Sequence, residues 1–510
     1  LDTERGTLQT LATDQTSGNV SISSNKNVTY NSNGITIQAA SSTSTGVLNF
    51  SNYSLCSWSF RKAEKFFDVV TYTGNGSNRT ISHSLGSVPA FMIIKRTSSA
   101  EDWTCYHISD GATKAISLNS DGGSFLLSGA WNDTAPTDSV FSVGTHDRTN
   151  TNGETYVAYL FASDAGGFGD DEDENIIKCG SYTGNGAVDG PTVTLGFEPQ
   201  WIIIKGTGGG DWTIFDNMRG LAVGGNDARI WANSSSAEND GYPYIDLQPT
   251  GFKLQGSTGG AANGNGSDYI YVAIRRPMKT PESGTEVFAL QNPGYPLGSN
   301  GLAYTSGFPV DLALSKEVSA TDDWLAMSRL QGAGNRLKPN TTGAEAGGIS
   351  SGTFDHMTGW YKTTSANMSW MFKRATGFMD VVCYSGTGSQ GYQVNHNLGV
   401  IPELIIIKRR NNASAEGWFV GTEFSATNFT QAKLNVTDTA VNSLAYTSSS
   451  IFKAQPTTTN FTLGNYQDVN NSSGDTYIAY LFATLAGVSK VGSYTGTGSN
   501  VNVDCGFSAG

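Results

Sequence analysis

Four tryptophans, each closely preceded by an acidic residue, are the side chains most able to do chemistry here. An exposed tryptophan beside a carboxylate can hold a sugar, because the ring stacks on C–H faces while the acid accepts hydroxyl hydrogen bonds. The pair is equally typical of a turn that an acidic side chain caps before an aromatic residue enters the core. The pairs combine Asp102, Asp211, Asp323 and Glu416 with Trp103, Trp212, Trp324 and Trp418. Because the tryptophans recur where the surrounding sequence has diverged, we expect them to fill cores, and ligand binding is the alternative.

The run Asp170–Glu174 is the densest cluster of charge. Calcium takes several oxygen ligands from carboxylates and carbonyls, and a folded loop could supply them. The run lacks the alternate spacing of a calcium loop, and consecutive like charges usually form a solvated connection. We expect a linker and no metal site, and calcium binding by this run is the alternative.

The histidines do not form a catalytic pattern. His83 and His396 occupy the same place in two similar segments, and His107 lies in the same segment as His83. Neither a Gly-x-Ser-x-Gly nor a His-Glu-x-x-His motif accompanies them. We therefore predict no catalytic residues and no cofactor. A polysaccharide-degrading enzyme is the alternative class, because a glycosidase needs only two carboxylates about 5 to 9.5 Å apart.

Composition excludes several classes of protein. The 510 residues carry a net charge of −13, which disfavours nucleic acid and anionic lipid as partners. No apolar stretch is long enough to insert into a membrane. The five cysteines are odd in number and widely spaced. We expect them to be reduced, buried side chains in a chain assembled in a reducing cytosol.

Three sequence patterns recur in the same order and indicate a tandem array. The first is a Gly/Pro segment that leads into an apolar run ending at Lys95, Lys205, Lys316 and Lys408. The second is a Tyr-x-Gly-x-Gly turn at Tyr72, Tyr182, Tyr384 and Tyr494. The third is an aromatic closing strand at 53–60, 155–162, 269–276, 368–373 and 476–483. The predicted segments are a partial unit at 1–63, repeats at 64–165, 176–276 and 376–484, a degenerate repeat at 282–375, and the opening of a further unit at 489–510.

Within each repeat the pattern predicts strands. Segments such as 67–73 and 379–385 mix β-branched and aromatic residues at strand length, and Gly/Asn/Asp turns separate them. The stretch 319–331 has a weak helical pattern, but its place in the repeat favours a turn into a strand. The predicted fold is all-β, a tandem array of antiparallel β-sandwich modules, jelly-roll-like, of about 100 residues each. We expect the natural protein to extend beyond residue 510, because an opening segment alone cannot bury its apolar face.

Four segments resemble a repeat family in large virion proteins of marine bacteriophages, especially cyanophages. They are 66–74, 132–137, 155–162 and 273–281. Members of that family are mostly named as tail-fibre or structural proteins, and the resemblance carries over no catalytic residue. It implies a structural component of the virion, an extended tail fibre or appendage that attaches to the host surface. We expect the chain to form a homotrimer, and we expect its partners to be other virion proteins and a host cell-surface glycan. A structural surface filament without a ligand is the further alternative.

Overall fold

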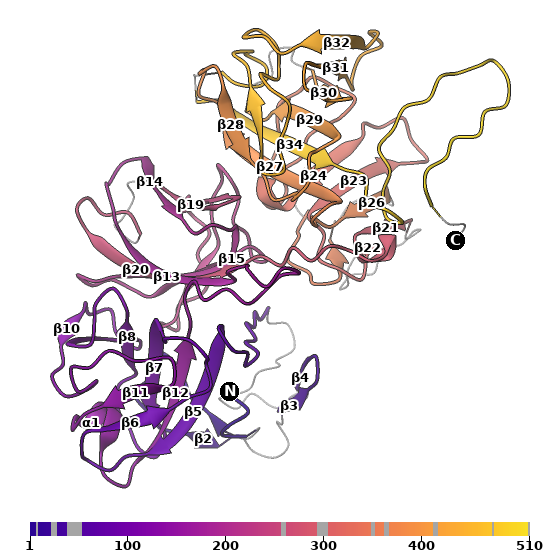
Figure 1. The fold of residues 1–510 in the computed structure, drawn as a ribbon. Helices are drawn as coiled ribbons and strands as arrows, with labels where there is room; N and C mark the ends of the chain where they lie inside the picture. Colours follow the sequence, from indigo (N-terminus) through magenta and orange to yellow (C-terminus); the bar gives the residue numbers. More distant parts are fainter. Residues whose placement is uncertain are drawn as a thin grey trace.

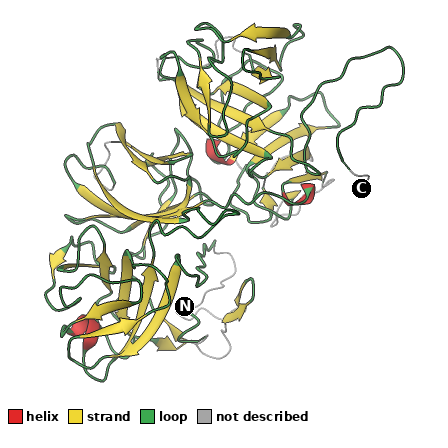
Figure 2. Cartoon of the chain, viewed as in Figure 1, coloured by secondary structure: helices red, strands yellow, loops and turns green. Residues whose placement is uncertain are grey.

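The structure is a computed structural model. It describes residues 1–6, 9–21, 28–37, 54–256, 262–292, 304–347, 352–361, 367–411, 417–471 and 474–507. Strands make up 39% of the described residues and helix 2%, which confirms the predicted all-β class. Figure 2 shows strands in yellow throughout the fold. In the part of the chain that is described, no helix is both long and apolar enough to cross a membrane.

Each of four large antiparallel sheets takes its strands from one stretch of about 100 residues, which we call modules 1 to 4. Module 1 (64–165) contains β5 Phe67–Thr73, β6 Arg79–Ser82, β7 Phe91–Arg96, β8 Thr104–His107, β9 Lys114–Ser117, β10 Phe125–Leu126, β11 Val140–Val143, the one-turn helix α1 Asp147–Asn150 and β12 Thr155–Phe161. Module 2 (176–276) contains β13 Ile177–Thr183, β14 Asp189–Thr194, β15 Pro199–Gly206, β16 Thr213–Asp216, β17 Arg229–Trp231, β18 Ile245–Gln248, β19 Gly251–Gln255 and β20 Asp268–Arg275.

Modules 3 and 4 repeat this plan, and Figure 1 shows them beside each other, module 3 in salmon to orange and module 4 in orange to yellow. Module 3 (282–375) contains η2 Gly284–Glu286, β21 Phe288–Gln291, β22 Tyr304–Thr305, β23 Leu312–Glu317, β24 Leu325–Ser328, η3 Arg329–Gln331, β25 Gly359–Trp360 and β26 Asn367–Phe372. Module 4 (376–484) contains β27 Met379–Ser385, β28 Tyr392–Asn395, β29 Leu404–Arg409, β30 Phe419–Thr422, β31 Asn428–Lys433, β32 Val441–Ala445, β33 Asn460–Leu463 and β34 Thr476–Phe482. The N-terminal segment adds β1 Gln9–Thr10, β2 Val20–Ser21, β3 Val28–Asn31 and β4 Gly34–Ile37.

The strand order is nested in the manner of a jelly roll. In module 1 the first strand, β5, pairs with the last, β12, which pairs with β7, and the second strand, β6, pairs with β11 in the smaller sheet. The strands β8, β9 and β10 then extend the large sheet as a meander instead of completing the second sheet. Module 4 has the same order. Module 2 has a meander shorter by one strand and a third strand, β18, in its smaller sheet, and module 3 keeps a shortened version.

The central strands of the large sheets are buried on both faces. In β12, Tyr156, Val157, Ala158 and Leu160 are all buried, although side chains of successive residues point to opposite faces. One face packs against the smaller sheet of the same module. The other packs against a neighbouring segment, so the modules meet through apolar sheet faces.

The chain differs from the sequence-based expectations at both ends. The expected closing strand 53–60 is not a strand in its described part, 54–60. This stretch instead packs against module 2, where the Trp58 indole donates to Asp216 at 3.1 Å. Residues 490–507 contain no strand, and Tyr494 is 72% exposed.

Two further expectations have different outcomes. The stretch 319–331 forms β24 and the single 3₁₀ turn η3, so the expectation of a turn and a strand is confirmed. All five cysteines are free thiols, but Cys56 and Cys505 are exposed rather than buried. These two lie in the terminal segments, outside the sandwich cores that bury the others.

Candidate functional site

The four repeated tryptophans occupy one structural position, a loop between two neighbouring strands of the large sheet. This loop joins β7 to β8 in module 1, β15 to β16 in module 2, β23 to β24 in module 3 and β29 to β30 in module 4. An asparagine side chain further along the chain holds each loop by accepting the backbone N–H of the tryptophan. The acceptors are Asn119 at 2.9 Å, Asn233 at 2.8 Å, Asn340 at 3.1 Å and Asn435 at 2.9 Å. Sequence reasoning missed these asparagines, although their recurrence 16 to 21 residues after each tryptophan was the available signal.

Three of the four tryptophans are buried between segments and not inside their own sandwich. The indole N–H of Trp212 in module 2 donates to the Ser117 carbonyl of module 1 at 2.9 Å. The indole of Trp418 in module 4 donates to the Lys338 carbonyl of module 3 at 3.1 Å. The indole of Trp103 likewise donates to the carbonyl of Ala12 in the N-terminal segment at 2.9 Å, with a longer contact to that of Gln15. The expectation that each tryptophan fills the core of its own unit is therefore corrected.

The lysine at the end of each apolar strand makes a parallel contact. The ammonium groups of Lys95, Lys205 and Lys408 donate to the carbonyls of Thr16 at 2.8 Å, Ser120 at 3.1 Å and Thr342 at 3.0 Å, all in the preceding segment. Burial lowers the pKa of Lys95 and of Lys205 to about 8. We call this pair of contacts the Trp–Lys junction, because tryptophan and lysine together bind backbone carbonyls of the segment before them.

The junction between modules 1 and 2 includes a buried histidine. The Nε2–H of His107 in module 1 donates to the Tyr271 carbonyl of module 2 at 3.2 Å. Burial lowers the pKa of His107 to about 4, so the ring is neutral at neutral pH. His83 instead contacts the Thr137 carbonyl at 3.2 Å, so the two histidines of this module have separate structural partners.

Trp324 in module 3 is the exception. It is 37% exposed, whereas Trp103, Trp212 and Trp418 are 4%, 1% and 2% exposed. Its ring stacks on Trp370 of the same module, with ring centroids 5.0 Å apart. The ammonium group of Lys316 donates to the Ala320 carbonyl in its own loop at 3.0 Å. Within the described ranges, neither side chain contacts a carbonyl of module 2, so module 3 lacks a Trp–Lys junction.

A cluster of buried charges joins module 2 to modules 3 and 4 instead. The guanidinium of Arg374 binds both carboxylate oxygens of Glu198 at 2.8 and 2.9 Å. Arg329 donates to Asp311 at 3.2 Å. Burial alone would raise the pKa of Asp311, but the arginines hold it below its ordinary value. We call this set the charged junction; its members are Glu198, Arg276, Asp311, Arg329, Arg374 and Asp380.

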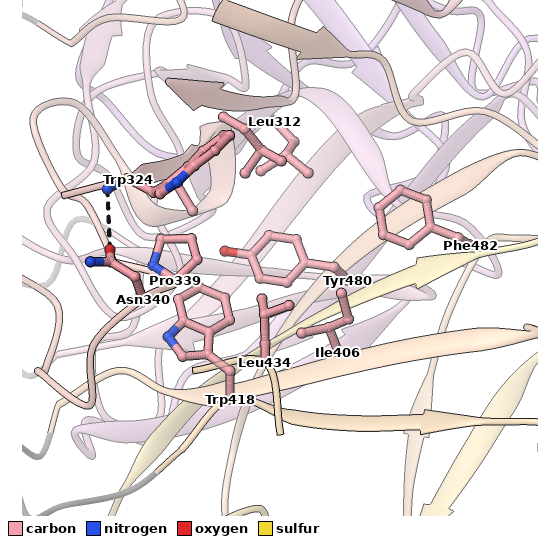
Figure 3. A pocket seen from close by; sticks show the side chains of 11 residues that line it. Leu312, Trp324, Pro339, Asn340, Ile406, Trp418, Leu434, Tyr480 and Phe482 are labelled. Carbon is pink, nitrogen blue, oxygen red and sulfur yellow. Dashed lines mark hydrogen bonds between the residues drawn. The ribbon is translucent and has the colours of Figure 1, made fainter. Parts of the chain in front are cut away.

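A pocket of about 320 Å³ lies between modules 3 and 4 (Figure 3). Module 3 contributes Trp324, Pro339 and Asn340 to its wall, and module 4 contributes Trp418, Leu434 and Tyr480. The side-chain oxygen of Asn340 accepts from Trp324, and its amide donates to Asp323 at 2.8 Å.

The wall of this pocket offers few polar groups to a ligand. The Tyr480 hydroxyl is buried and has no hydrogen-bond partner among the described residues. Both ends of the Asn340 amide are already paired. The hydroxyls of a sugar would find few partners here, because burying an unpaired polar group is unfavourable. A glycan-binding role for the four tryptophans therefore stays a prediction that this pocket does not favour.

The acidic run forms an exposed turn. Glu174 forms an ion pair with Arg275 at 2.8 Å, and the Gly167 N–H donates to the Glu172 carbonyl at 2.9 Å. No group of three or more His, Cys, Asp or Glu side chains in the described part of the chain is placed to hold a metal ion.

Comparison with known proteins gives one match. No curated protein and no solved structure matches the chain significantly. A family model matches residues 1–277 and 360–509, and the stretch between them contains most of module 3, including Trp324. Because the matched residues make up most of the sequence, the chain belongs to the family described as Domain of unknown function (DUF7483).

Proposed function

We propose that this chain is a structural protein of a bacteriophage virion, a tail fibre or other appendage built from tandem β-modules. The observation that carries the proposal is the Trp–Lys junction, which recurs between the N-terminal segment and module 1, between modules 1 and 2, and between modules 3 and 4. The resemblance to virion proteins of marine bacteriophages gives the array its biological setting.

The Trp–Lys junctions suit a structural protein that bears mechanical load. Each one buries a tryptophan and pairs a lysine with backbone carbonyls, so a module contacts its neighbour through fixed directional bonds as well as apolar area. Tandem modules of this kind are stabilised by nearest-neighbour contacts, and length is added without a new fold. The charged junction adds a second fixed contact, because breaking a buried ion pair is strongly unfavourable.

Attachment to the host surface is part of the proposal. Weak contacts repeated on each module and on each copy would add by avidity. Three of the four repeated tryptophans lie inside the array, so we place these contacts on the exposed surface of the appendage and not on those rings.

Antibody labelling tests the proposal directly. An antibody raised against the full chain should bind purified particles of the virus that encodes it, and gold labelling should place it on an appendage. The free protein should also compete with particles for adsorption to host cells. Absence of the chain from purified particles would rule out a virion role. Labelling without competition would leave a structural part that takes no role in attachment.

A further inference from the structure

We infer that the pocket between modules 3 and 4 is a binding site for a small planar aromatic molecule that carries one hydrogen-bond acceptor. Its inner wall is formed where the two modules meet. Leu312 and Ala326 of module 3 are 2% and 1% exposed, and Trp418 and Tyr480 of module 4 are 2% and 3% exposed. The inference goes beyond the proposed function, because a structural role in a virion requires no small ligand.

The wall of the pocket has the composition of a site for an apolar ligand. Four aromatic side chains line it, Trp324, Trp418, Tyr480 and Phe482, and most of the others are aliphatic. Small-molecule sites are typically apolar and aromatic with a few polar groups, and they have volumes of roughly 300 to 1,000 Å³. The volume here, about 320 Å³, suits a ligand of one or two rings.

A ring is missing from this pocket in comparison with the junction of modules 1 and 2. There, Phe91 is the first residue of β7 and pairs with the last residue of β8, and its ring centroid lies 6.0 Å from that of Trp212. In module 3 the same register places Leu312 at this point, as the first residue of β23 opposite the last residue of β24. Leu312 lines the pocket together with Trp418, the counterpart of Trp212. An aromatic ligand supplies the ring that module 3 lacks.

The Tyr480 hydroxyl is the polar group that selects the ligand. It is buried and has no hydrogen-bond partner among the described residues. In Figure 3 it points toward Pro339, on the module 3 side of the pocket. The equivalent hydroxyl in module 1, that of Tyr159, donates to the Asp2 carboxylate at 2.7 Å. An acceptor on the ligand gives Tyr480 the partner that Tyr159 has, and leaving a buried donor unpaired is unfavourable.

The remaining polar groups favour an uncharged ligand. Burial raises the pKa of Tyr480 well above its ordinary value, so the hydroxyl keeps its proton and acts as a donor. Both ends of the Asn340 amide are paired, and the Trp418 indole already donates to the Lys338 carbonyl. Among the described residues, no charged side chain lines the pocket. An aryl ketone, ester or ether fits these groups, whereas a sugar or an ion does not.

Equilibrium dialysis of the full chain against 2-acetylnaphthalene tests the inference. A second probe, 2-ethylnaphthalene, has a similar shape but no acceptor. The wild-type chain should bind one molecule of either probe. Tyr480→Phe should weaken binding of 2-acetylnaphthalene about fivefold to tenfold, because it removes a single neutral hydrogen bond, and should change binding of 2-ethylnaphthalene by less than about twofold.

A second variant closes the pocket with the side chain that module 1 uses. Leu312→Phe places a ring where Phe91 stands in module 1 and should abolish binding of both probes. Its melting temperature should be unchanged or higher, because filling a cavity commonly stabilises a protein. Val188→Phe adds the same ring at a side chain that is 70% exposed, so this matched control should bind both probes like wild type.

Three results overturn the inference. They are a wild-type chain that binds neither probe, binding that persists in Leu312→Phe, and a Tyr480→Phe variant that affects the two probes equally. If Leu312→Phe lowers the melting temperature, the comparison of the two probes on Tyr480→Phe decides the question by itself. None of these results bears on the virion role, because that role is tested on purified particles.

Discussion

The boundary between modules 1 and 2 and the boundary between modules 2 and 3 use the same repeat position in opposite ways. Trp212 is 1% exposed because module 1 covers its ring and accepts its N–H. Trp324 stands in the same loop but is 37% exposed, because module 2 contacts module 3 through Arg329 and Arg374 instead. The role of a repeated residue in this chain is therefore set by the neighbouring module, and its own module sets only its position.

The two boundaries also differ in the kind of interaction that stabilises them. The Trp–Lys junction combines apolar burial with hydrogen bonds to neutral carbonyls. The charged junction buries carboxylates and guanidinium groups together, and each group depends on its partners because an unpaired buried charge is costly. The first kind of contact can be repeated at any edge with a free carbonyl, whereas the second requires a matched set of residues.

The largest effect is expected at the charged junction. Arg374→Ala leaves Glu198, Asp311 and Asp380 without their shared cation, so the free energy of unfolding should fall by about 3 to 5 kcal/mol. Denaturant unfolding of the full chain measures the change. Arg61→Ala, at an exposed arginine, should have almost no effect. Equal stability of the two variants would show that the cluster does not hold the modules together.

The tryptophan comparison should give the next largest difference. Trp212→Ala removes a buried ring and its hydrogen bond, which should cost about 3 to 5 kcal/mol. Trp324→Ala removes a half-exposed ring that stacks on one neighbour, which should cost about 1 kcal/mol. Thermal unfolding of both variants measures the ratio. Similar losses at both sites would contradict the view that the neighbouring module decides the role of the residue.

Acid should lower the free energy of unfolding of the chain through its buried histidines. Burial lowers the pKa of His107 and of His396 to about 4, below the value of about 6.5 in an unfolded chain. Their contribution to stability is complete above pH 6.5 and is lost as the pH falls toward 4, because the unfolded chain then binds protons that the folded chain does not. Each histidine should account for about 3 kcal/mol at most.

Unfolding measured between pH 7 and pH 4 tests this. His107→Gln should flatten part of the pH dependence and should act on the boundary of modules 1 and 2, where the ring donates to Tyr271. A wild-type stability that is constant over this range would contradict the depressed pKa values.

The smallest effect is expected at two equivalent tyrosines. Tyr159 donates to the Asp2 carboxylate at 2.7 Å, whereas the buried hydroxyl of Tyr480 has no partner among the described residues. Tyr159→Phe should therefore cost about 1 to 2 kcal/mol, and Tyr480→Phe should leave stability unchanged or raise it slightly. A clear loss for Tyr480→Phe, seen in thermal melts, would mean that its hydroxyl is paired in solution.

Much of the fold followed from local pattern. Strand-length runs such as 67–73, separated by Gly and Asn turns, were enough to predict the all-β class. The order of the recurring patterns placed Lys205 and Trp212 at the same point of each repeat as their counterparts. The stretch 319–331 was also assigned correctly from the repeat order, where helical periodicity alone would have misled.

The site could be predicted only in part. The sequence singled out the four tryptophans but assigned them to the cores of their own units, since periodicity reports a buried side chain and not what buries it. The asparagine that holds each loop was missed because it lies in a different loop, 16 to 21 residues further along the chain. The charged junction was missed as well, because Glu198 and Arg374 are separated by 176 residues.

The sequence by itself determined the all-β class of the fold and the order in which the Tyr, Lys and Trp positions recur, because these depend on local propensity and spacing. Only the tertiary structure decided which face of each module is covered. That choice depends on how the outer sheet faces of successive modules pack together, and on whether carbonyls such as those of Ser117 and Lys338 come within reach of an indole. Such contacts join residues from different modules, and no local pattern in the chain encodes their distance.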